Sequence, residues 1–114
     1  AIFSSGVIVN SNVRIGGASM VTGGVRISRD VPPFIVATDN PVRYGGVNEK
    51  LLKSSGTTDK VIGHIANAYR LVFHGQTSVF DAVIQIKEQV PEGKEVNAII
   101  KFIKGTQLGI IGKI

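Results

Sequence analysis

The chain has 114 residues, a hydrophobic content of 43% and a net charge of +5 at pH 7. This length predicts one domain, or one domain with an appendage, and the absence of cysteine excludes disulfides and thiolate metal sites. No apolar run approaches the roughly 20 residues of a membrane-spanning helix, so we expect no transmembrane segment. The positive charge suits an acidic partner, which could be nucleic acid, an anionic membrane, an acidic protein or a phosphorylated substrate.

The start of the chain carries no secretory signal, and its first residue is Ala rather than Met. These features predict a processed or truncated chain. Together with the lack of cysteine, they fit a cytoplasmic location.

A six-residue repeat runs through residues 1–33. Its first inward column contains Phe3, Val9, Ile15, Val21 and Ile27, and the column four residues later contains Val7, Val13, Ser19, Val25 and Val31. A helix would need apolar spacings of three and four, and the glycines also oppose one. A period of six with short strands predicts a parallel β-helix in which three repeats complete one coil, with an irregular β-meander as the alternative. Five repeats make fewer than two coils, so we expect further coils upstream or neighbouring chains against the open strand edges.

A double proline, Pro32-Pro33, follows the last repeat. Proline lacks the N–H that a strand ladder needs, and it restricts the residue before it. We therefore expect regular strand pairing to end there, and residues 34–47 to form a linker that starts extended and becomes a loop.

Helical patterns fill residues 48–114, which we expect to form a helical domain, a small bundle of four helices. Their predicted starts are at Asn48, after Thr58, at Ser78 and near Lys94. Their predicted ends are near Gly56, at Gly75, before Pro91 and before Gly105. The apolar run "LGIIGKI" at the end of the chain needs burial, and an extended terminal segment would provide it.

Three motifs in a fixed order identify a family. They are "RDVPPF" at residues 29–34, "GGVN" at residues 45–48 and "NAYRLVF" at residues 67–73. Together with the repeat and the helical tail, they resemble the C-terminal part of the UDP-N-acetylglucosamine O-acyltransferases. The resemblance covers almost the whole chain and implies a mixed β and α fold, a left-handed parallel β-helix followed by a small helical bundle, assembled as a homotrimer.

The activity that the resemblance implies is the first step of lipid A synthesis in the cytoplasm. The family moves a 3-hydroxyacyl chain from acyl carrier protein to the 3-hydroxyl of UDP-N-acetylglucosamine, without a metal or a bound cofactor. A histidine serves as general base, and the resemblance places it upstream of this chain. His64 and His74 are therefore expected to have structural roles.

Substrate contacts follow from the resemblance at two places. The family usually has His-Gln-Phe, which lines the substrate cleft, where this chain has Asn10, Ser11 and Asn12. A polar corner of the solenoid is an equally weighted explanation for these three residues. Asn48 matches a family asparagine near the nucleotide sugar, and it also suits a helix cap.

A basic helix end that can meet nucleotide phosphates is altered in this chain. Lys53 remains, but Ser54 and Ser55 stand where the family has two arginines. Hydroxyls can hydrogen-bond to phosphate without supplying charge. For the acyl groove, the resemblance implies that Gly23 leaves room for the acyl tail and that Met20 forms a wall or packs nearby.

Two alternatives stay open beside the acyltransferase. One is a non-catalytic trimerisation or interaction module, favoured by the missing base and the lost arginines, and the other is a transferase of this type acting on another nucleotide sugar. Nucleic-acid binding is disfavoured because the chain lacks a basic stripe with interleaved aromatics. Gly16-Gly17 and Gly23-Gly24 fit neither phosphate-binding glycine motif. The acyl length and the exact acceptor do not follow from the sequence.

Overall fold

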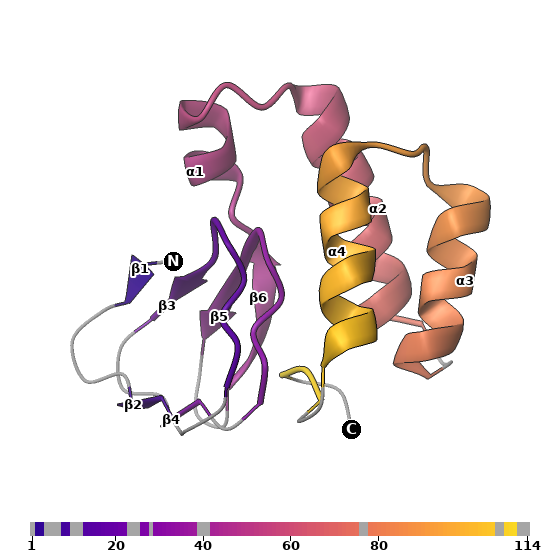
Figure 1. The fold of residues 1–114 in the computed structure, drawn as a ribbon. Helices are drawn as coiled ribbons and strands as arrows, with labels where there is room; N and C mark the ends of the chain where they lie inside the picture. Colours follow the sequence, from indigo (N-terminus) through magenta and orange to yellow (C-terminus); the bar gives the residue numbers. More distant parts are fainter. Residues whose placement is uncertain are drawn as a thin grey trace.

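The computed structural model describes residues 2–3, 8–9, 13–22, 26–27, 29–38, 42–75, 78–106 and 109–111. Within them the chain is mixed α/β, with short strands on one side and most of the helical residues on the other (Figure 1). The strands are β1 (Ile2–Phe3), β2 (Ile8–Val9), β3 (Met20–Val21), β4 (Arg26–Ile27), β5 (Ile35–Thr38) and β6 (Arg43–Val47). The helices are α1 (Glu49–Ser54), α2 (Asp59–Phe73), α3 (Val79–Gln89) and α4 (Lys94–Gly105).

The first four strands pair in parallel at a constant offset. Ile2 lies opposite Met20 and Ile8 lies opposite Arg26, so each partner lies three repeats further along the chain. This is the register that a coil of three repeats requires.

Members of both inward columns point into the core where the structure describes their side chains. Val21, Ile27 and Val31 are fully buried. Ser19, a polar member of the second column, is also buried, and its hydroxyl donates a 2.6 Å hydrogen bond to the Gly16 carbonyl. The hydroxyl can therefore replace an aliphatic side chain without leaving a polar group unsatisfied.

The double proline does not end the strand pairing, and that prediction is wrong. Strand β5 pairs in parallel with β3, with Met20 opposite Val36. The pairing does not need the N–H groups that the two prolines lack, because the residues on either side of the prolines make the hydrogen bonds. The Val31 N–H donates to the Arg14 carbonyl at 2.9 Å, and the Phe34 N–H donates to the Gly17 carbonyl at 2.9 Å.

The predicted linker of residues 34–47 contains the strands β5 and β6. They pair antiparallel, with Ile35 opposite Val47 and an irregular register between Ile35 and Ala37. The four-stranded sheet then has the order β1-β3-β5-β6. Gly46, at a φ of 117°, adopts a backbone conformation that L side chains rarely accept.

The helices begin close to where the sequence predicts them. The Thr58 hydroxyl accepts a hydrogen bond from the Val61 N–H at 3.3 Å, and the Ser78 hydroxyl accepts one from the Asp81 N–H at 3.2 Å. Such caps satisfy donors that a helix start leaves unpaired. Helices α2, α3 and α4 contact one another, and α2 also contacts β6. Among the described residues, no helix is long and apolar enough to cross a membrane.

Asp30 joins the strand part to the end of α4. Its carboxylate is buried and accepts hydrogen bonds from the Arg14 N–H at 2.8 Å and from the Thr106 hydroxyl at 2.6 Å. Its backbone pairs with the final segment, where Ile110 and Ile111 are buried as the sequence predicts. These hydrogen bonds of Asp30, which we call the clamp, therefore hold the strand part to the end of α4.

Candidate functional site

Asn48 lies between β6 and α1, and 6% of its surface is exposed. Its backbone carbonyl accepts from the Leu52 N–H at 3.1 Å, so the residue occupies the cap position of α1. Its side chain, however, makes no capping bond to α1. Instead the amide Nδ2 donates to the Ala18 carbonyl at 3.2 Å. Asn48 thus ties the start of α1 to a turn of the repeat.

Ala18 has a φ of 54°, which is uncommon for a residue with a Cβ. The turn that it forms lies against Phe34, and the Phe34 carbonyl accepts from the Asn48 backbone N–H at 2.7 Å. Asn48 therefore contacts two segments of the strand part at once. This arrangement fixes where α1 leaves the sheet.

The C-terminal end of α1 presents the three residues that the sequence analysis assigns to phosphate contact. Lys53, Ser54 and Ser55 are all exposed. The Lys53 ammonium lies 3.9 Å from the Asp59 carboxylate, an exposed pair that contributes about 0–1 kcal/mol. Both serine hydroxyls donate to the Leu51 carbonyl at 2.9 Å. To donate to a phosphate, each hydroxyl must rotate away from the helix.

A cavity of about 400 Å³ lies beside α1. It brings together Ser55 with the turn at Ala18 and the first turn of α4, which contributes Lys94 and Glu95. Lys94 is not among the contact residues predicted from the sequence. The sequence feature that could have identified it is a lysine in the first turn of a helix, where the helix dipole disfavours cations.

Of the other residues predicted to contact substrate, one lies in the described part of the chain and the rest lie outside it. Met20 is half-buried on β3, between Ile2 and Val36. Asn10, Ser11 and Asn12 lie outside the described residues, as does Gly23. Their proposed roles stay predictions.

Neither histidine lines the cavity beside α1 in the part of the chain that is described. His64 is half-buried on α2. His74, just after α2, is exposed and turns its ring edge toward the Tyr44 ring, with centroids 6.1 Å apart. The structural roles expected for His64 and His74 stay predictions.

The two tyrosines of the chain form an aromatic cluster with Phe73. Tyr44 stacks on Phe73 with ring centroids 4.3 Å apart, and Tyr69 is fully buried beside both. Burial raises the pKa of Tyr44. Burial, with a smaller contribution from repulsion by Tyr44, raises the pKa of Tyr69 well above its ordinary value. The Tyr69 hydroxyl donates to the Pro33 carbonyl at 2.5 Å, so it acts as a structural donor.

Comparison with known proteins decides the family. The family described as "Udp N-acetylglucosamine O-acyltransferase; Domain 2" matches residues 30–111. The chain belongs to this family. The resemblance inferred from the three sequence motifs is therefore confirmed.

Relatives of this family match most of the chain. An acyl-carrier-protein-dependent UDP-N-acetylglucosamine O-acyltransferase from Paraburkholderia phymatum is 34% identical over 107 residues, covering 90% of this chain and 41% of the relative. The corresponding enzyme from Burkholderia thailandensis is 32% identical with the same coverage. The chain thus spans about two fifths of the length of these relatives.

Solved structures of the family share the fold. LpxA, a UDP-N-acetylglucosamine acyltransferase from Bacteroides fragilis, superposes with a TM-score of 0.94 at 35% identity, covering 96% of this chain and 43% of that protein. LpxA from Acinetobacter baumannii gives a TM-score of 0.92 at 26% identity, covering 96% of this chain and 43% of that protein. The described elements therefore have the arrangement found in this family.

Proposed function

We propose that the protein containing this chain transfers a 3-hydroxyacyl group from acyl carrier protein to the 3-hydroxyl of UDP-N-acetylglucosamine, the first step of lipid A synthesis. The observation that carries the proposal is the close superposition on a UDP-N-acetylglucosamine acyltransferase over nearly the whole chain. The relatives' names support the acyl carrier protein as donor.

The architecture proposed for the whole protein is a cytoplasmic homotrimer of left-handed parallel β-helices. Parallel pairing of strands that lie three repeats apart supports a coil of three repeats. The proposed division is a solenoid over residues 1–33, a segment over 34–47 whose strands β5 and β6 extend the same sheet, and a helical bundle domain over 48–114. Mutual contacts of α2, α3 and α4 support the bundle.

In this proposal the chain supplies substrate contacts, and the histidine base comes from a segment upstream. The end of α1 faces the nucleotide phosphates, where Lys53 provides charge and the hydroxyls of Ser54 and Ser55 provide hydrogen bonds. Lys94 shares a cavity with Ser55, so its ammonium replaces part of the charge of the arginines. Asn48 holds α1 in place through Ala18. Asn10 and Ser11 line the substrate cleft, and Met20 and Gly23 border the acyl tail.

A second candidate function is a non-catalytic trimerisation module. The observation in its favour is that both serine hydroxyls are already bound to the Leu51 carbonyl. A site with one lysine, Lys53, at the C-terminal end of α1 and two occupied hydroxyls binds an anion less strongly than one with a row of arginines.

A chimera distinguishes the two functions. The matching segment of the Paraburkholderia phymatum relative is replaced by this chain, so that the relative's own upstream part supplies the base. Transfer from 3-hydroxyacyl carrier proteins of several acyl lengths to UDP-N-acetylglucosamine is then measured by mass spectrometry. We expect product with at least one acyl length, and none from this chain alone. A folded, trimeric chimera that forms no product with any donor would support the scaffold function instead.

A further inference from the structure

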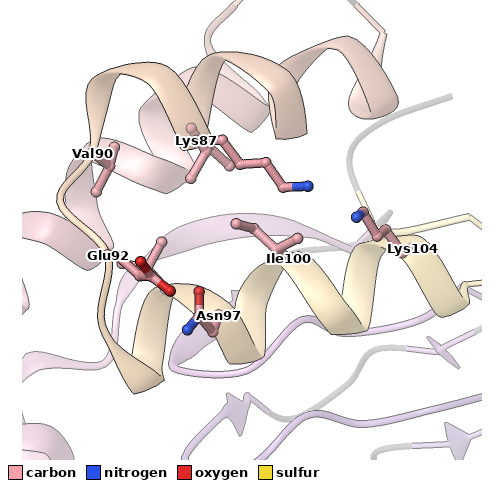
Figure 2. Close-up of a pocket in the computed structure, with 8 residues that line it drawn as sticks. Lys87, Val90, Glu92, Asn97, Ile100 and Lys104 are labelled. Atoms are coloured by element: carbon pink, nitrogen blue, oxygen red, sulfur yellow. The ribbon is translucent and has the colours of Figure 1, made fainter.

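A second hollow of about 310 Å³ lies between α3 and α4, away from α1 (Figure 2). Its floor is aliphatic and is formed by Ile86, Val90, Val96 and Ile100. Pockets that hold small organic molecules range from about 300 to 1,000 Å³. This groove, which we call the α3–α4 groove, is therefore large enough for a small ligand with an apolar part.

The two ends of the α3–α4 groove carry different charges. At one end the ammonium groups of Lys87, from α3, and Lys104, from α4, face each other above Ile100 (Figure 2). At the other end lie Glu92 and Asn97. A ligand with a single negative charge fits this distribution in only one orientation.

The lysine pair has no counter-charge within the described part of the chain, where neither ammonium forms an ion pair with a carboxylate. The Lys87 ammonium lowers the pKa of Lys104, first because only a deprotonated Lys104 amine can accept a hydrogen bond from it, and second because the two positive charges repel each other. Two like charges held close together destabilise each other, and an anion between them removes that repulsion. The pair is therefore suited to binding an anionic group.

We propose that the α3–α4 groove binds a small single-chain amphiphile, a medium-chain carboxylate, with its head group between Lys87 and Lys104 and its alkyl chain over Ile100. The aliphatic floor continues from the lysines toward Glu92, so a bare inorganic anion would leave this surface uncovered. Glu92 disfavours a second negative charge at the far end. The proposal is independent of the acyltransferase activity, because the groove shares no lining residue with the cavity beside α1.

The test measures the binding of decanoate to the 114-residue chain by calorimetry and locates the bound decanoate by amide NMR shifts. We expect shifts confined to α3 and α4. Lys87→Gln and Lys104→Gln should each weaken binding about tenfold, because a charge-assisted hydrogen bond contributes roughly that factor. Lys101→Gln, an exposed lysine of α4 outside the groove, should leave the affinity unchanged. All three positions are exposed, so the variants should remain folded.

Five further ligands decide what the groove recognises. Decanol and decyltrimethylammonium, which lack the anionic head, should not bind. Inorganic phosphate should bind much more weakly than decanoate, and a ten-carbon dicarboxylate should bind less well than decanoate until Glu92→Gln removes the opposing charge. Equal decanoate binding by the double variant Lys87→Gln/Lys104→Gln would overturn the proposal. So would phosphate binding as tight as decanoate, or binding of an acidic peptide without any decanoate binding.

Discussion

The strand part and the helical part of the chain are held together by different kinds of interaction. In the strand part, backbone hydrogen bonds join segments that are distant in sequence and adjacent in the coil, such as those of Gly16 and Val31. In the helical part, the backbone bonds are local and amphipathic faces meet across α2, α3 and α4. A change in the strand part therefore disturbs several turns of the chain at once, whereas a change at a helix surface stays local.

The largest effect is expected at Gly16, where two turns of the strand part lie close together. A Cβ at Gly16 would lie 2.2 Å from the Pro33 backbone nitrogen, whereas one at Gly17 would meet nothing within 4 Å. Gly16→Ala should lower the free energy of unfolding by about 3 kcal/mol or more, because backbone must move to admit it. Gly17→Ala is the matched control and should change it by less than about 0.5 kcal/mol. Urea denaturation followed by circular dichroism measures both, and equal stabilities would refute the close approach.

The next effect concerns the clamp between the two parts. Asp30→Ala removes the acceptor of the Arg14 N–H and the Thr106 hydroxyl. Leaving these two part-buried donors unpaired should cost about 2 kcal/mol. The exposed Asp59→Ala should cost little by comparison. Hydrogen exchange of the α4 amides locates the loss, and an unchanged exchange rate at the end of α4 would contradict the clamp.

A smaller effect is expected at the aromatic contact between the parts. Tyr69→Phe removes the hydrogen bond to the Pro33 carbonyl while keeping the ring. The loss should be about 1–2 kcal/mol, because the carbonyl remains buried. Thermal unfolding measures it. A variant as stable as the parent would mean that the Pro33 carbonyl finds another donor.

The smallest effect is electrostatic and confined to a helix surface. Lys87→Met should raise the pKa of Lys104 toward its ordinary value, as measured by NMR titration of the side chain. In the parent the folded state binds fewer protons than the unfolded state between the lowered and the ordinary pKa. Stability should therefore rise with pH in that alkaline window, and the variant should show a flatter rise. An unchanged pKa of Lys104 in the variant would show that the two ammonium groups do not interact.

Much of the helical part could be predicted from the sequence because its signals are local. The caps at Thr58 and Ser78 lie within three residues of the donors that they bind. The six-residue repeat was equally visible, since its columns determine that Ile2 pairs with Met20, three repeats further along. Ser19 fitted its column although it is polar, because its hydroxyl bonds back to Gly16.

Other features depend on residues distant in sequence and could not be predicted in this way. Whether Pro32-Pro33 ends a sheet depends on which segment lies alongside it, and Gly16 and Gly17 belong to an earlier turn of the coil. Likewise, the Asn48 side chain leaves the helix that it was expected to cap because Ala18 offers an acceptor. Lys94 and Ser55 line one cavity only because the fold brings the first turn of α4 to the side of α1.

The acyltransferase proposal requires that this chain contributes working nucleotide-sugar contacts rather than a scaffold alone. The most direct test is the KM for UDP-N-acetylglucosamine in the chimera, with Lys53→Gln and Lys94→Gln compared against the exposed control Lys60→Gln. We predict that KM rises about fivefold in the first two variants, with kcat unchanged, because each loses a contact to the bound phosphates. Unchanged KM values in both variants would contradict the claim.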